Sequence, residues 1–183
     1  MDSFIQWRGI ASILLALAGC ATTTMAAVEK DAAAKSFAST ADQANVYVYR
    51  LSANAGGVTF PVSLDGRILG ELAVGTFAHA VVTPGTHTVL VSGKRREPVS
   101  VAVVAEAGKN VFVKVDPRSS PWGFVWPTPP TIHLLQVSDQ EDAMEEVRRC
   151  DLIKGTDRAP TGGEAPDAWI PPHWTPQAKL APQ

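Results

Sequence analysis

The sequence predicts a mainly β fold, a small antiparallel β-sandwich of about seven to eight strands with one C-terminal helix. From Asn45 onwards, short runs of β-branched residues are interrupted by Gly and Pro, a pattern typical of strands and turns. Valines recur at every second position in 99–103 and again in 111–115, which indicates strands with one buried face. Several short strands at such intervals favour an antiparallel sandwich or barrel over a parallel sheet.

Several runs of the sequence are expected to be strands, and they span residues 45–50, 58–64, 68–74, 77–83, 87–91, 99–104, 111–115 and 131–137. Asp65-Gly66 predicts a type I′ hairpin turn, because both residues tolerate positive φ angles. Pro61 predicts that its strand lies at a sheet edge or begins pairing late, because proline has no N–H to donate to a neighbouring strand.

One helix is expected from Ser138 to about Ile153. Ser138 is the predicted N-cap, and Glu141 stands three residues later, as in a capping box. Met144, Val147 and Cys150 recur at helical spacing and form the predicted apolar stripe.

The N-terminus has the features of an export signal. Arg8 precedes a short apolar run, Ile10 to Leu17, which is far shorter than the roughly 20 residues that cross a bilayer. The sequence Leu17-Ala18-Gly19-Cys20 that follows resembles the lipobox of bacterial lipoproteins, which implies that residues 1–19 are removed and that Cys20 is lipidated. The alternative is an ordinary signal peptide with an incidental cysteine, cleaved after Ala18 or near Ala26.

The lipobox resemblance also implies a location. Ala21, rather than Asp, follows the cysteine, which is similar to lipoproteins of the outer membrane, so the expected location is the cell envelope, on the outer membrane and facing the periplasm. Residues 20–43 are expected to be a lipidated N-terminus and flexible tether, in which 26–38 has the composition of a transient helix. The β-sandwich with its helix is expected over 44–155, and the Pro-rich segment 156–183 is expected to be an extended or disordered tail.

Charge and motif content argue against several function classes. The formal net charge is −2, and no basic patch is visible in the sequence, so neither nucleic acid nor anionic lipid beyond the anchor is an expected partner. No cofactor is expected, because Gly162-Gly163 lacks the Lys-Ser/Thr of a phosphate loop. No metal site is expected either. His79 and His87 can face each other only across a hairpin centred on Pro84-Gly85, with Glu71 nearby, and two histidines are a weak metal signal.

Cys150 is the second of two cysteines, and three interpretations of it are open. It is a small buried hydrophobic residue, a site of disulfide formation with another chain, or a reactive thiol beside Arg148 and Arg149. Its place in an amphipathic helix favours the first interpretation.

Aromatic residues are the candidate binding residues. Trp122, Phe124 and Trp126 alternate, so on an extended segment they share one face and can stack on a sugar or a protein partner. The alternative is that they close one end of the sandwich core. Trp169 and Trp174 stand near Pro171-Pro172, where a polyproline conformation can bind a partner.

The predicted strand region resembles the domain of unknown function 2846, which occurs in bacterial envelope proteins, often behind a lipobox. The matching residues are Val46-Tyr47-Val48-Tyr49-Arg50, Val62-Ser63-Leu64-Asp65-Gly66-Arg67, Gly70-Glu71-Leu72, Gly75-Thr76-Phe77, Pro84-Gly85-Thr86-His87-Thr88 and Glu106-Ala107-Gly108-Lys109. The resemblance implies a small β-sandwich over about residues 45–115 and implies no catalytic residue.

Two functions are compatible with these features. The first is a membrane-anchored envelope lipoprotein that acts as a non-enzymatic binding or structural module, with an envelope protein or peptidoglycan as partner. The alternative is a hydrolase that acts on an envelope polymer through carboxylates that the sequence does not identify, and it predicts two neighbouring carboxyl groups with perturbed pKa values in a cleft.

Overall fold

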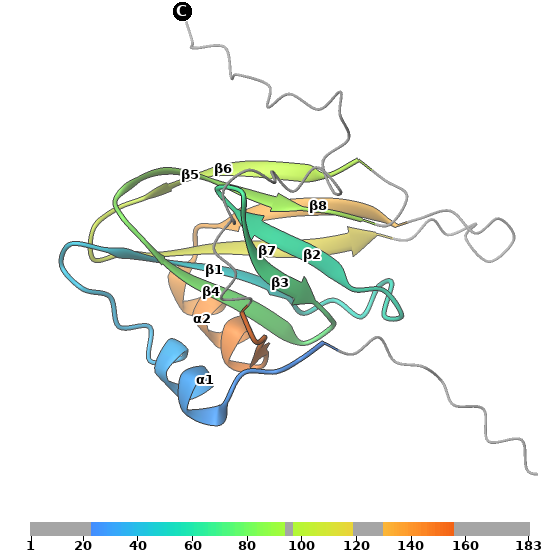
Figure 1. The fold of residues 1–183 in the computed structure, drawn as a ribbon, viewed down its shortest axis with the longest axis horizontal. Helices are drawn as coiled ribbons and strands as arrows, with labels where there is room; N and C mark the ends of the chain where they lie inside the picture. The colour runs from blue at the N-terminus through green and yellow to red at the C-terminus, as the bar shows by residue number, and fades with distance from the viewer. Residues whose placement is uncertain (1–22, 94–96, 119–129, 156–183) are drawn as a thin grey trace, which may run out of the picture.

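The computed structural model describes residues 23–93, 97–118 and 130–155, and it forms two β-sheets with two helices (Figure 1). The elements are α1 Val28–Ala34, β1 Ala44–Arg50, β2 Phe60–Leu64, β3 Arg67–Leu72, β4 Thr76–Val82, β5 Gly85–Val91, β6 Val99–Ala105, β7 Asn110–Arg118, β8 Thr131–Val137, α2 Gln140–Arg148 and β9 Asp151–Leu152. One sheet has the strand order β8-β7-β1-β4-β9 and the other the order β3-β2-β5-β6. The prediction of a mainly β sandwich is confirmed.

The molecule has three layers (Figure 1). The two sheets face each other across a core of aliphatic side chains, and α1 and α2 cover the other face of the five-stranded sheet. A second, largely aromatic core lies between that sheet and the helices, and it contains Tyr47, Tyr49, Phe77 and Phe112. The five-stranded sheet is therefore buried on both faces.

β1 shows the consequence of this layering, because all seven of its residues are buried. Val46 and Val48 point into the core between the sheets, whereas Tyr47 and Tyr49 point into the core under the helices. Side chains alternate between the two faces of a strand, so β1 contributes to both cores. The alternation of valine and tyrosine in the sequence reflects these two environments.

The expected strands are all present, and their bounds differ from the predicted ones by a few residues. β7 continues past the predicted end at Val115 because Pro117 pairs with Ile132 of β8. The turn between β2 and β3 has φ angles of 51° at Asp65 and 79° at Gly66, which confirms the type I′ turn.

The pairing of the strands differs from a purely antiparallel arrangement. β1 pairs with β7 in parallel, and β4 pairs with β9 in parallel, so the five-stranded sheet is mixed. β4 and β5 belong to different sheets, so no hairpin forms around Pro84-Gly85. Consecutive strands often pair, but here the chain crosses to the other layer.

Pro61 lies in an interior strand rather than at an edge, since β2 lies between β3 and β5. The pairing of β2 with β5 begins at Val62, directly after the proline. Ser92 N donates to Pro61 O at 3.0 Å, and Pro61 donates no backbone hydrogen bond in exchange because it has no N–H. Of the two predictions for Pro61, the late start of pairing is therefore confirmed and the edge position is wrong.

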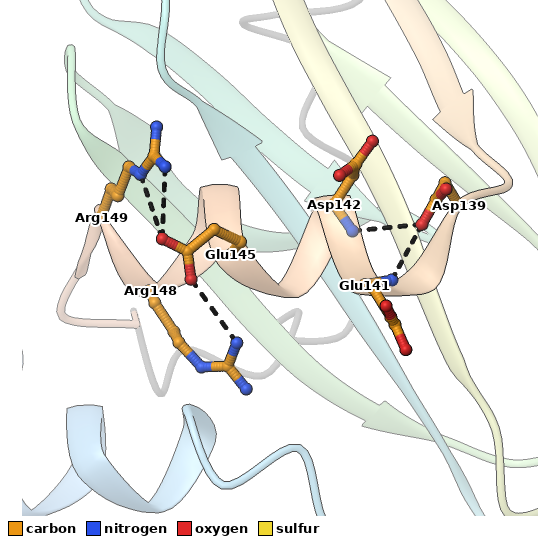
Figure 2. A network of polar contacts seen from close by, with 6 residues as sticks. All are labelled: Asp139, Glu141, Asp142, Glu145, Arg148 and Arg149. Atoms are coloured by element: carbon orange, nitrogen blue, oxygen red, sulfur yellow. Dashed lines mark hydrogen bonds and ion pairs between the residues drawn. The ribbon is translucent and has the colours of Figure 1, made fainter.

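Asp139, not Ser138, is the N-cap of α2. One carboxylate oxygen of Asp139 accepts hydrogen bonds from Glu141 N at 3.0 Å and Asp142 N at 3.1 Å (Figure 2). The predicted Ser138 cap is wrong, because the helix begins one residue later and a carboxylate also suits the positive end of the helix dipole.

The last turn of α2 carries ion pairs from Glu145 to Arg148 at 3.7 Å and to Arg149 at 3.2 Å (Figure 2). The helix ends at Arg148 rather than near Ile153, because the following residues form β9 beside β4.

The segment before β1 is packed against the domain, which differs from the flexible tether that the sequence predicts for 20–43. Lys154 N donates to Thr24 O at 2.7 Å, and Ala26 N donates to Leu152 O at 2.8 Å. Ala34 and Phe37 are buried in the aromatic core, and Tyr47 Oη donates to Ala34 O at 2.9 Å. This packing follows from the apolar outer face of the five-stranded sheet, which α1 covers. Neither described helix is long and apolar enough to cross a membrane.

Removal of the Asp139 cap tests the assignment of the N-cap. Asp139→Ala is expected to lower the free energy of unfolding by about 1 kcal/mol, because two backbone N–H groups lose their acceptor. Ser138→Ala is the matched control and is expected to change it by less than about 0.5 kcal/mol. Urea unfolding followed by circular dichroism measures both values, and a larger loss for Ser138→Ala would contradict the assignment.

Candidate functional site

The predicted lipidation site and the predicted aromatic binding residues lie outside the residues that the structure describes. They are Cys20, Trp122, Phe124, Trp126, Trp169 and Trp174. The described residues nearest to them in sequence are residue 23 after Cys20, Arg118 and Pro130 around the aromatic run, and Gly155 before the C-terminal segment.

Cys150 is fully buried in the aromatic core, with none of its surface exposed. Its Sγ lies 3.4 Å from Glu146 O, and burial raises the pKa of the thiol to about 12. A protonated and inaccessible thiol is a poor nucleophile. The interpretation of Cys150 as a small buried hydrophobic residue is therefore confirmed.

The two histidines of the hypothetical metal pair are separated by the fold. His79 lies on β4, its ring stacks on Tyr47 with 4.8 Å between the ring centroids, and its Nε2 lies 3.1 Å from Asn45 Oδ1. Burial lowers the pKa of His79, so the neutral ring is favoured. His87 lies on β5 in the other sheet, and within the described residues no three His, Cys, Asp or Glu side chains are grouped to hold a metal ion.

His87 links the β2–β3 turn to the start of β5. Its Nδ1 lies 2.6 Å from Asp65 Oδ2, and its Nε2 lies 2.8 Å from Thr83 O. Both partners are acceptors, so the geometry suits a ring with a proton on each nitrogen. The hydrogen bond to Asp65 is the main reason that the pKa of His87 is raised.

Glu146 joins α2 to the five-stranded sheet. Its carboxylate accepts a hydrogen bond from Tyr49 Oη at 2.6 Å and another from Lys114 Nζ. Burial alone raises the pKa of Glu146, but these hydrogen bonds and the Lys114 charge outweigh it and lower the pKa. Glu146 is therefore held ionised as a structural link between layers.

The strongest candidate site is a cavity of about 610 Å³ at the edge of the sandwich, beneath α1. The segment leading to α1, the beginning of β3, β4 and the residues around β9 form its walls. Its apolar lining includes Leu69, Leu152 and Ile153. We refer to it as the α1 cavity.

Three cations from separate parts of the chain also line the α1 cavity. Lys30 comes from α1, Arg67 begins β3, and Lys154 follows β9. All three side chains are exposed, and none forms an ion pair with a described carboxylate. No Asp or Glu is among the described residues that line the cavity. An apolar hollow with cations and no acid suits a ligand that has an anionic group and an apolar part.

Sequence reasoning missed this site because the three cations are far apart in the chain. Nothing in their local patterns distinguishes them from solvated surface residues. A second cavity, of about 510 Å³, lies between α2 and the ends of β6 and β7, and its lining carries both signs of charge, with Glu106 and Lys109. Because both signs of charge line it, this second cavity does not favour an anionic ligand as the α1 cavity does.

The comparison with protein families gives a match. The model of the family described as "Protein of unknown function (DUF2846)" matches residues 40–125. Over these residues the chain is similar to the DUF2846 family. The resemblance seen in the sequence is therefore confirmed, and the match includes β1 to β7. The comparison with curated proteins gives no match.

The α1 cavity is only partly built by the residues that match DUF2846. Arg67, Leu69 and β4 lie within the matched residues, whereas Lys30 on α1 and Lys154 after β9 lie outside them. The flanking segments therefore supply two of the three cations, in addition to one wall of the cavity.

The raised pKa of His87 predicts a pH-dependent contribution to stability. A raised pKa in the folded state means that the contribution is complete below the unfolded value of about 6.5 and is lost as the pH rises through the folded value. His87→Gln is expected to lower the free energy of unfolding by up to about 1 kcal/mol below pH 6, and by less above pH 8. Urea unfolding across this pH range measures the difference. The matched control is His133→Gln on β8, whose exposed ring has no hydrogen-bond partner among the described residues. An equal pH dependence in both variants would contradict the prediction.

Proposed function

We propose that this chain is a membrane-anchored envelope lipoprotein that acts as a non-enzymatic binding or structural module. In this proposal, residues 1–19 are removed and Cys20 carries the lipid, on the outer membrane and facing the periplasm. The support for the anchor is the sequence Leu17-Ala18-Gly19-Cys20 after a short apolar run. Two or more acyl chains on one cysteine provide stable membrane attachment.

One structural observation supports the module. The packed domain already includes Thr24 and Met25, directly after the proposed anchor, through the hydrogen bond from Lys154 N to Thr24 O and the bridge between Met25 and Ile153. The described packing thus begins four residues after the proposed anchor. Such an arrangement suits a protein that presents a rigid surface at the membrane.

The chemistry of the described residues is also consistent with a binding module. Three groups with altered pKa values have structural roles: the Cys150 thiol is buried in a core, Glu146 accepts hydrogen bonds from Lys114 and Tyr49, and His87 bonds Asp65. The alternative, a hydrolase of an envelope polymer, requires two neighbouring carboxyl groups with perturbed pKa values. Nothing in the described part of the chain favours it over the binding module.

Loss of the anchor cysteine tests the location. Cys20→Ser is expected to move the protein from the membrane fraction to the soluble fraction of the cell, because lipid attachment requires the thiol. Mass spectrometry of the N-terminal peptide is expected to show acyl chains on Cys20 of the wild type. A wild-type N-terminus after Ala18 or near Ala26 would contradict the proposal and support an ordinary signal peptide.

Partner capture tests the binding role. The lipidated protein, recovered from detergent-solubilised envelopes, is expected to retain a specific envelope protein or peptidoglycan fragment. Trp122→Ala is expected to weaken this retention several-fold, because a large aromatic anchor contributes more than about 1 kcal/mol to a typical interface. Val104→Ala, which shortens an exposed side chain of β6, is the control. Equal retention by wild type and Trp122→Ala would remove the aromatic run from the proposed interface.

A further inference from the structure

We propose that the α1 cavity faces the membrane that holds Cys20, and that Lys30, Arg67 and Lys154 bind the phosphate groups of its anionic phospholipids. This inference rests on the proposed lipid anchor and adds to it the orientation of the domain and the class of lipid that it contacts. A lipid contact beyond the anchor is not expected from the sequence, because the three cations come together only in the folded chain.

The first step is the distance from the anchor. Thr24 stands four residues after Cys20, and a fully extended chain spans at most about 3.6 Å per residue. Thr24 therefore lies within about 14 Å of a lipidated Cys20. Because Lys154 N donates to Thr24 O at 2.7 Å, the rim of the α1 cavity is held at the same short distance from the bilayer.

The second step is the charge of the residues that line the cavity. Three cations and no acidic residue line the α1 cavity, although the chain as a whole has a formal net charge of −2. Electrostatic attraction to anionic headgroups acts over a Debye length of about 8 Å at physiological salt. Only charges that are held near the bilayer contribute, so the local charge matters more than the net charge.

The third step is the apolar surface beside the cations. Met25 lines the α1 cavity with 45% of its surface exposed, and Val28 at the start of α1 is 79% exposed. Apolar side chains next to lysine and arginine are typical of segments that lie in the headgroup region of a bilayer. A lipid surface accounts for both the cations and the exposed apolar side chains.

Vesicle binding by the unlipidated protein tests the surface separately from the anchor. The protein is the mature chain 20–183 with Cys20→Ser, which contains every described residue from 23 to 155 and therefore the whole packed domain. It is expected to sediment with vesicles of phosphatidylglycerol and phosphatidylethanolamine, and not with vesicles of phosphatidylcholine alone. Lys30→Gln, Arg67→Gln and Lys154→Gln together are expected to weaken this binding about a hundred-fold, which is about five-fold per cation.

The matched control removes the same charge elsewhere, and its substitutions are Lys109→Gln, Arg118→Gln and Arg149→Gln. This control is expected to bind the anionic vesicles within a few-fold of the parent protein. An equal loss in the two triple variants would overturn the proposal, because the attraction would then depend on total charge. The absence of binding to anionic vesicles would overturn it as well. Circular dichroism of both variants verifies that they remain folded, as the exposure of the substituted side chains leads us to expect.

A fluorescence experiment tests the orientation. An environment-sensitive dye on Val28→Cys is expected to shift to the blue on anionic vesicles, because α1 would enter the headgroup region. The same dye on Val104→Cys is not expected to shift, since β6 lies on the opposite side of the fold from α1 (Figure 1). Val104 is a suitable partner because it is also an exposed valine, at 61%. Labelling is selective in the Cys20→Ser background because Cys150 is fully buried. A shift at Val104, or none at Val28, would overturn the orientation.

The two proposals fail in different ways. If Cys20 carries acyl chains but the cavity variant binds as the control does, only the lipid contact is wrong. If Cys20 carries no lipid, nothing holds Thr24 near the bilayer, and the inference falls together with the anchor, whatever the vesicles show.

Discussion

The rest of the structure depends on the burial of β1 on both of its faces. Val46 and Val48 have no exposed surface in the core between the sheets, and Tyr49 has none under the helices. Each fully buried valine side chain contributes roughly 1.5–3 kcal/mol when it is removed from water. The two cores therefore share one strand, and a change to β1 that weakens one core also shifts the strand in the other. The helices are part of the domain for the same reason, because without them the tyrosine face of β1 would be exposed.

Arg50, the last residue of β1, extends this constraint to the loop that follows. Its guanidinium is fully buried and donates to three backbone carbonyls, Val58 O at 2.6 Å, Asn54 O at 2.7 Å and Ala55 O at 2.8 Å. It also lies over the ring of Phe60, 4.7 Å from the centroid. Burial lowers the pKa of Arg50 to about 10, so the group stays charged at neutral pH. Hydrogen bonds to a charged donor stabilise by about 1.5–3 kcal/mol each, which offsets much of the cost of burial. The carbonyl groups of the loop thus accept the hydrogen bonds that a carboxylate usually accepts from a buried arginine.

Local features of the fold were predictable from the sequence, and long-range pairings were not. The Asp65-Gly66 turn was predictable because both residue types tolerate the positive φ angles that a type I′ turn requires. β1 and β7 pair in parallel although the chain crosses to the other sheet and back between them. No local sequence pattern predicts this pairing. Asp139 and Ser138 are both good N-cap residues, and only the geometry of the first turn decides between them. Lys30, Arg67 and Lys154 come together around the α1 cavity only in the folded chain. His79 and His87 are separated because β4 and β5 belong to different sheets.

The packing of residues 24 to 37 changes what the proposed anchor implies. A flexible tether of the predicted length, ending at residue 43, would leave the domain free to turn relative to the membrane. In the structure, Leu152 N donates to Asp31 Oδ1 at 2.8 Å and Phe37 lies in the aromatic core. These contacts remove the rotational freedom that a flexible tether would allow. A lipid on Cys20 would then restrict the orientation of the domain as well as its location. The same short connection would also hold Lys30 and Lys154 close to the headgroups, so a single packing contact would determine both the orientation of the domain and which charges face the bilayer.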